Sequence, residues 1–195
     1  MPKIEFGPAR GKGRLNQNSV VEAAVTLFNQ QGYDRTSMNE IAAALGITKA
    51  ALYYHFASKE DILVAGISRA SEIVQAALGD SGKPTDSASQ QIENFVRAYG
   101  EALLNPIFRC LVLADERVLG PEGQVKIREC KRHNQHQLEA LLRAAGAAPH
   151  DVRPVALSVF GALNWSATAF GDRIGAELDG LTRAVLKLLK TAQEA

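Results

Sequence analysis

The sequence has little of what marks disulfide-rich, zinc-binding or membrane proteins. Two cysteines, Cys110 and Cys130, occur in 195 residues, without CxxC or zinc-ribbon spacing. We expect both thiols to be free, as in a reducing compartment. No apolar run reaches the length of a membrane span, and the chain does not begin with a signal-peptide h-region. We therefore expect a cytoplasmic protein with no membrane partner.

Enzyme motifs and a strong overall charge are also lacking. The sequence contains no GxGxxG, Walker A, HExxH or GxSxG segment, so we predict that it is not an enzyme and has neither catalytic residues nor a cofactor. The net charge is +1, and 46% of the residues are hydrophobic. These values are ordinary for a globular chain that is long enough to bury a core.

Apolar residues recur at helical spacing along the chain, and no strand-type alternation or hairpin signal occurs. The sequence therefore predicts an all-α protein. Three helix starts follow one another in S-M-N-E-I-A-A-A-L-G-I-T-K-A-A-L-Y-Y-H-F-A-S-K-E-D-I-L, residues 37–63. The first start is a capping box of Ser37 and Glu40, and the third is one of Ser58 and Asp61.

Between these boxes, Gly46 ends the first helix and Thr48 caps a second that runs to Phe56. Two short helices joined by a tight glycine turn are the sequence form of a helix-turn-helix. Leu52 and Phe56 face inward with Ala51. The remaining positions carry donors, small groups and two aromatic rings, with no acid: Thr48, Lys49, Ala50, Tyr53, Tyr54 and His55. An acid-free exposed helix suits the major groove of DNA, although an ordinary helical hairpin would also fit this pattern.

The same run resembles the DNA-binding signature of the tetracycline-repressor (TetR) family of bacterial regulators. The preceding segment from Ser19 to Tyr33, which ends in F-x-x-x-G-Y, is similar to that family's first helix. The resemblance covers residues 14–66. It implies a homodimeric regulator that binds double-stranded operator DNA, a repressor released by a small ligand. An activator, a ligand-independent regulator and, more distantly, an enzyme or protein-binding adaptor remain alternatives.

Each residue of the signature then has an expected role. Lys49, Ala50 and Tyr53 would lie nearest the bases, because lysine donates to guanine and alanine contacts the thymine methyl. The expected phosphate contacts are Ser37, Asn39, Thr48, Tyr54, His55 and Lys59. We interpret residues 1–17, with Arg10, Lys12 and Arg14, as a flexible basic arm that either contacts DNA or is simply solvated.

We expect a helix-turn-helix domain over residues 18–60, opened by a capping box of Ser19 and Glu22, and a larger helical domain over 61–195. Helix four, 58–78, would belong to both and could transmit a ligand signal. The larger domain is expected to bind ligand and to dimerise. Its expected helices cover residues 92–103, 107–119, 124–145, 151–170 and 177–191.

The larger domain carries an aromatic and polar set that could line a ligand cavity or simply pack as core: Phe95, Tyr99, Phe108, Phe160, Asn164, Trp165 and Phe170. The G-A-L-N-W stretch is similar to that of family members with large, mostly apolar ligands, which implies an acyl or steroid-type thioester. Ala169-Phe170 stands where those members often have a Trp-Tyr pair, which is a departure from the pattern.

The last two expected helices each show an apolar face: Val155, Val159, Ala162, Leu163 and Ser166 on one, and Leu181, Val185, Leu188 and Leu189 on the other. The resemblance to the TetR family implies that these two faces pair with those of a second copy in a four-helix dimer interface. Intramolecular packing would leave the same pattern. Cys130, His133 and His136 share one helical face. We predict no metal site there, and the sequence leaves open whether these residues or Cys110 sense metal or oxidants.

Overall fold

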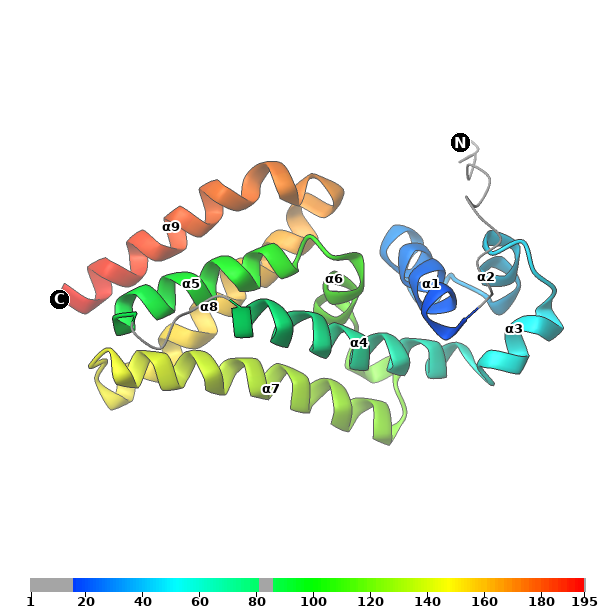
Figure 1. Ribbon diagram of the computed structural model, residues 1–195, viewed down its shortest axis with the longest axis horizontal. Helices are drawn as coiled ribbons and strands as arrows, with labels where there is room; N and C mark the ends of the chain where they lie inside the picture. Colours follow the sequence, from blue (N-terminus) through cyan, green and yellow to red (C-terminus); the bar gives the residue numbers. More distant parts are fainter. Residues whose placement is uncertain (1–15, 81–85, 195) are drawn as a thin grey trace. The chain divides into compact units, whose positions relative to one another are not determined.

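The computed structural model describes residues 16–80 and 86–194, and over these ranges it is all-α, as predicted (Figure 1). The helices are α1 (Gln17–Gln31), α2 (Met38–Ala44), α3 (Lys49–His55), α4 (Lys59–Asp80), α5 (Ala88–Ala102), α6 (Pro106–Leu113), α7 (Pro121–Ala144), α8 (Pro149–Phe170) and α9 (Ile174–Glu194), with short 3-10 turns η1 (Glu116–Val118) and η2 (Gly171–Arg173). The expected basic arm, with Arg10, Lys12 and Arg14, lies almost wholly outside the described residues.

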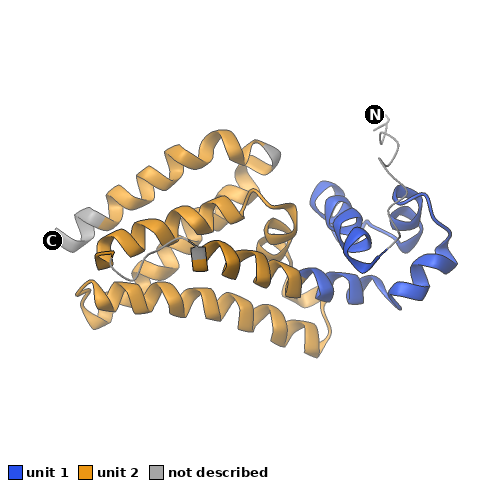
Figure 2. Cartoon of the chain, viewed as in Figure 1, with its two compact units in different colours: residues 1–66 blue, residues 67–195 orange. Residues whose placement is uncertain are grey.

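The chain divides into two compact units, residues 1–66 (unit 1) and 67–195 (unit 2), shown in Figure 2. The division falls within α4, six residues beyond the expected boundary between 60 and 61. Helix α4 therefore contributes its first two turns to unit 1 and the rest to unit 2.

Unit 1 is built around the buried side chains Val20, Ala24, Ile41, Leu52 and Ile62, each 0% exposed. Helix α1 begins at Gln17, just before the expected start near Asn18 or Ser19. The Asn16 side chain accepts from the Ser19 amide at 2.9 Å, and the Ser19 hydroxyl accepts from the Asn16 amide at 3.2 Å. The expected box of Ser19 and Glu22 was therefore wrong, because asparagine caps a helix as well as serine does.

In unit 2 the expected buried helix over 107–119 is present only as far as Leu113, so its predicted end was wrong. Helix α6 begins at Pro106, with Asn105 as its cap, and ends at Leu113. Asp115 then accepts from the Arg117 amide at 3.0 Å and caps η1. The chain turns polar after α6, with Asp115, Glu116 and Arg117, and the local side chain–backbone bond of Asp115 competes with helix continuation.

One described helix, Lys59–Gly79 of α4, is long and apolar enough to cross a membrane by length and composition alone. Its apolar stripe is buried within the protein instead: Ile62, Leu63, Ile67 and Val74 are at most 2% exposed. A buried stripe of this kind is typical of a helix in the core of a globular protein.

Candidate nucleic-acid interface and ligand-binding region

The turn between α2 and α3 is fixed by backbone hydrogen bonds around Gly46. The Gly46 amide donates to the Ala43 carbonyl at 3.1 Å, and the Ile47 amide donates to the Ala42 carbonyl at 3.0 Å. This pair of bonds is a Schellman motif, and it places Gly46 at φ +67°, where a side chain is disfavoured. The Thr48 hydroxyl then accepts from the Ala51 amide at 3.1 Å and starts α3.

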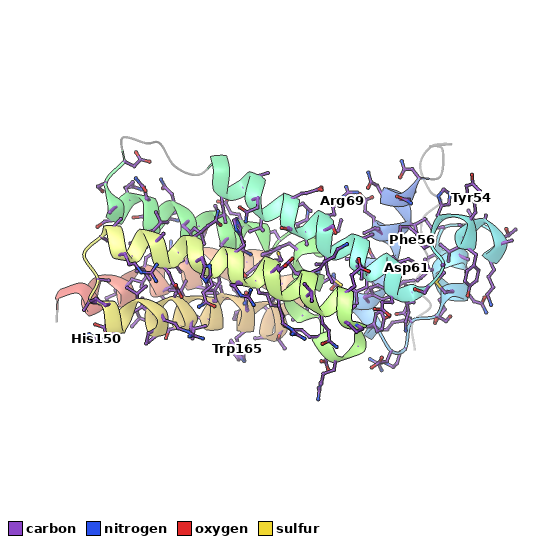
Figure 3. The ribbon with its side chains drawn as sticks, turned by 90° about the horizontal axis from the view of Figure 1, so that it is seen from below. Tyr54, Phe56, Asp61, Arg69, His150 and Trp165 are labelled. Carbon is purple, nitrogen blue, oxygen red and sulfur yellow. The ribbon has the colours of Figure 1, made fainter. Side chains whose placement is uncertain are left out.

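Helix α3 has one buried and one exposed face. Leu52 (0% exposed) and Phe56 (7%) point into unit 1. Tyr54, labelled in Figure 3, is 87% exposed. Tyr53 is 43% exposed, and the Lys49 ammonium lies 5.7 Å from the Tyr53 ring centroid. Thr48, Lys49 and Ala50 are also exposed, and His55 is half-buried beside the Tyr54 ring. The exposed face of α3 thus presents donors, a small apolar group and aromatic rings.

Of the residues expected to contact phosphates at the start of α2, the structure places Ser37 in a cap. Its hydroxyl donates to Glu40 Oε2 at 2.8 Å and accepts from the Glu40 amide at 3.2 Å. Hydrogen bonds from Ser37 lower the pKa of Glu40, so a carboxylate stands beside this hydroxyl. Asn39 is exposed and turned to solvent. Asn39 is therefore a better placed phosphate donor than Ser37.

Lys59 lies against Tyr33 rather than on the exposed face. Its ammonium donates to the Tyr33 carbonyl at 2.6 Å and sits 4.0 Å from the centroid of the Tyr33 ring. These contacts fasten the start of α4 to the loop between α1 and α2. Sequence reasoning missed this partner because 26 positions separate the two residues.

In unit 2, four aromatic residues from the expected ligand set pack together. The Tyr99 ring contacts Phe108 (5.2 Å between centroids) and Phe160 (4.9 Å), and Phe95 lies 6.2 Å from Phe160. All four are at most 9% exposed. The Tyr99 hydroxyl donates to Asn164 Oδ1 at 3.0 Å, and burial raises the pKa of Tyr99 above its usual range. The structure therefore joins five of the seven expected residues in one buried cluster.

The other two expected ligand residues form a separate pair. The rings of Trp165 and Phe170 lie 6.4 Å apart, and Trp165 is 66% exposed, projecting from α8 in Figure 3. Trp165 therefore faces solvent rather than the buried cluster.

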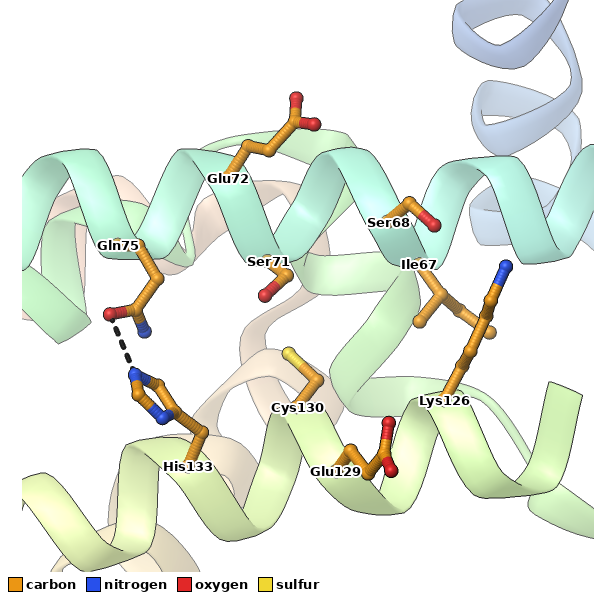
Figure 4. A pocket seen from close by; sticks show the side chains of 9 residues that line it. All are labelled: Ile67, Ser68, Ser71, Glu72, Gln75, Lys126, Glu129, Cys130 and His133. Carbon is orange, nitrogen blue, oxygen red and sulfur yellow. Dashed lines mark hydrogen bonds between the residues drawn. The ribbon is translucent and has the colours of Figure 1, made fainter.

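A hollow of about 470 Å³ opens between α4 and α7, within unit 2 (Figure 4). At one end Gln75 bridges the helices: its amide nitrogen donates to Asn134 at 2.9 Å, and its oxygen lies 3.1 Å from His133 Nε2. Cys130 and Ser71 line the hollow between its two ends.

Comparison with known proteins identifies unit 1. Residues 20–65 match the family described as bacterial regulatory proteins, tetR family. The chain is also similar over 86% of its length to the TetR family transcriptional regulator PfmR from Thermus thermophilus, covering 97% of that chain with 29% identity and a TM-score of 0.74. Residues 20–65 therefore belong to the TetR family.

Two further comparisons bear on the chain that carries this TetR segment. A 46-residue segment is 46% identical to IcaR, the HTH-type negative transcriptional regulator of the biofilm operon icaADBC from Staphylococcus aureus, but it spans only 25% of IcaR and 24% of this chain. AibR, solved with isovaleryl coenzyme A and operator DNA, shares the fold at 24% identity and a TM-score of 0.72, over 85% of this chain and 95% of AibR. The match to IcaR therefore covers about a quarter of each chain.

The last two helices, α8 and α9, form an apolar groove of about 250 Å³. Leu188 in this groove is 71% exposed, and Leu157 nearby on α8 is 48% exposed. Leu163 and Ser166, expected on the same face, are fully buried within the chain instead. A Cβ added at Gly161 would meet nothing within 4 Å, so another helix could approach α8 closely there.

The cysteines and histidines do not gather into a site. Among the residues that the structure describes, no three His, Cys, Asp or Glu side chains could share a metal ion. Burial raises the pKa of Cys110 to about 12 and also raises that of Cys130. Both thiols are therefore held in the protonated, unreactive form at neutral pH.

Proposed function

We propose that this chain is a homodimeric transcriptional repressor that binds operator DNA through α3 and is released by a small ligand. The observation that carries the proposal is the exposed, acid-free face of α3, held by Leu52 and Phe56 beneath it. Phosphates repel carboxylates, and lysine and tyrosine donors can read base edges in the major groove. The family is one of bacterial regulatory proteins, which accords with the prediction that the chain is not an enzyme.

We assign Lys49, Ala50 and Tyr53 to base contacts and Thr48, Tyr54, His55 and Asn39 to the DNA backbone. Repression rather than activation is supported by IcaR, a negative regulator that matches this segment. Because DNA is the target, the chain would act in the cytoplasm.

Dimerisation through α8 and α9 follows from the apolar groove and the exposed Leu188. A single helix-turn-helix reads a short half-site, and two half-sites read by a symmetric dimer multiply both affinity and discrimination. A second copy of α8 and α9 would cover Leu157 and Leu188, side chains that are costly to leave in water.

The effector would bind in the hollow between α4 and α7. Ile67 and Cys130 offer apolar contacts there, while Ser71, Gln75 and His133 offer hydrogen bonds. That combination suits a mostly apolar acyl group with a polar end. The fold is compatible with such a partner, since AibR was solved with isovaleryl coenzyme A. Helix α4 lines the hollow and continues into unit 1, so a ligand that favours one position of α4 would alter DNA binding.

The test is selection of DNA from a random duplex pool, followed by fluorescence anisotropy with the enriched sequence and a shuffled duplex across a salt series. We expect a two-fold symmetric site and a discrimination of at least ~10³. No enriched sequence, or equal affinity for both duplexes, would refute specific DNA binding. Short-chain to long-chain acyl thioesters are then added to the complex. Release supports the repressor, and binding of an acyl thioester without release favours an activator or a ligand-independent regulator.

A further inference from the structure

A second hollow in unit 2, of about 610 Å³, has a lining that is mostly basic. We call it the basic hollow. Five Lys and Arg side chains line it: Arg128, Lys131, Arg132 and Arg143 of α7, and Arg153 of α8. Only two carboxylates join them, Glu116 and Glu139. Across residues 67–195, Lys and Arg equal Asp and Glu in number, so this excess is local.

Both carboxylates of the basic hollow are already engaged. Glu116 accepts from Arg128 at 3.3 Å and from Lys131 at 3.1 Å. Glu139, whose side chain is 8% exposed, accepts from Arg143 at 3.0 Å and from Gln135 at 2.7 Å, and these bonds lower its pKa. Three cations therefore share two carboxylates, which leaves positive charge uncompensated.

The remaining two guanidinium groups carry the inference. Arg132 and Arg153 come from different helices and line the same hollow. Within residues 16–80 and 86–194, neither has a hydrogen bond or an ion pair. Their donors therefore remain available, and the guanidinium fork matches the geometry of phosphate oxygens.

We propose that the basic hollow binds the di- or triphosphate group of a small phosphorylated molecule, held by Arg132 and Arg153. A single phosphate would meet only part of the positive charge, whereas adjacent phosphates would meet both guanidinium groups. The volume lies in the range of small-molecule sites. The concave form of the basic hollow favours a compact ligand over the rigid convex backbone of a duplex. This site is separate from α3 and from the aromatic cluster, so the inference goes beyond the proposed function.

The test is isothermal titration calorimetry of the full chain with pyrophosphate, ADP and orthophosphate at low and moderate salt. We expect pyrophosphate and ADP to bind more tightly than orthophosphate, with affinity falling as salt rises. The double variant R132Q/R153Q should lower pyrophosphate affinity at least ~10-fold. R132K/R153K keeps both charges but loses the planar guanidinium groups, so its pyrophosphate affinity should lie between those of the unmodified chain and R132Q/R153Q.

Two controls localise the binding. R183Q removes one exposed charge from α9, and K49Q removes one from α3; both should leave pyrophosphate affinity unchanged. Circular dichroism melts check that each variant is folded, as expected for exposed side chains. Because Lys49 is assigned to DNA contacts, K49Q also shows whether pyrophosphate binding is independent of the proposed DNA-binding surface.

Three results would overturn the proposal: no binding of pyrophosphate or ADP to the unmodified chain, equal affinity in R132Q/R153Q, or loss of pyrophosphate binding in K49Q. A fourth arm titrates a random 20-base-pair duplex. If R132Q/R153Q weakens the duplex but not pyrophosphate, the basic hollow is a nucleic-acid surface and the small-molecule assignment is wrong.

Discussion

The Lys59 ammonium lies 4.0 Å above the ring of Tyr33 and donates to the carbonyl of the same residue at 2.6 Å. One side chain at the start of α4 thus holds the loop that follows α1. Tyr33 in turn packs on Phe28, with 5.1 Å between ring centroids. The entry of α4 is therefore tied to the core of unit 1 by a chain of contacts.

We expect Lys59→Met to destabilise the protein by about 1–2 kcal/mol, because it removes a charged hydrogen bond and a cation–π contact while keeping the aliphatic stem. Urea denaturation measures the loss. Lys49→Met is the matched control: it should change stability by less than about 0.5 kcal/mol and yet weaken operator binding. An equal effect of both variants on stability would contradict the structural role given to Lys59.

Tyr53→Ala should weaken operator binding by about 1–3 kcal/mol, since the ring and hydroxyl are exposed on α3 and free to meet DNA. Tyr53→Phe keeps the ring and removes the hydroxyl, so it measures the contribution of the hydroxyl to operator affinity. Anisotropy with the selected operator measures both variants. Unchanged affinity in Tyr53→Ala would remove this residue from the interface.

Asn164→Leu should cost about 1–3 kcal/mol of stability, because it leaves the buried Tyr99 hydroxyl without its acceptor. Tyr99→Phe in the same background should recover much of that loss, since no buried hydroxyl then remains. A double-mutant cycle by urea denaturation gives the coupling. Additive effects of the two substitutions would show that this hydrogen bond contributes nothing to stability.

Stability should fall in alkaline solution. Burial raises the pKa of Cys110 from about 9 to about 12, so the native state holds this proton more tightly than the unfolded state does. The unfolded state then binds fewer protons between these values, and the free energy of unfolding falls with rising pH in that window. Cys130 and Tyr99 shift in the same direction. Urea denaturation at pH 8 and pH 10 measures the drop, and Cys110→Ala should make it smaller; an equal drop would mean that other groups cause it.

Leu188→Glu should dissociate the proposed dimer, because it places a charge on an apolar groove whose leucine is 71% exposed in the single chain. Light scattering after size exclusion measures the mass. The exposed Lys187→Glu on the adjacent position of α9 controls for added negative charge. A mass unaffected by Leu188→Glu would place the interface elsewhere.

Local sequence signals predicted unit 1 well. The bonds around Gly46, the Thr48 cap and the box of Ser37 and Glu40 all join residues at most five positions apart, and a pattern in the sequence reports them directly. The inward face of α3 follows from helical periodicity for the same reason. The start of α1 was misplaced because two capping residues compete within four positions.

Contacts between distant residues could not be predicted in this way. The bond from Tyr99 to Asn164 joins positions 65 apart, so an aromatic set that could line a cavity could not be told from one that packs as core. The exposure of Trp165 likewise depends on which turn of α8 faces the cluster. The basic hollow combines η1, α7 and α8, and no single segment signals it.

Trp165 is the sole tryptophan of the chain, and it stands in solvent on α8. Its indole emission therefore comes from one known position, without a label and without interference from a second tryptophan. A solvated indole emits at longer wavelength than a covered one. Any second chain or bound molecule that covers this part of α8 would shift the emission to the blue. The protein thus contains an intrinsic optical reporter of events on α8.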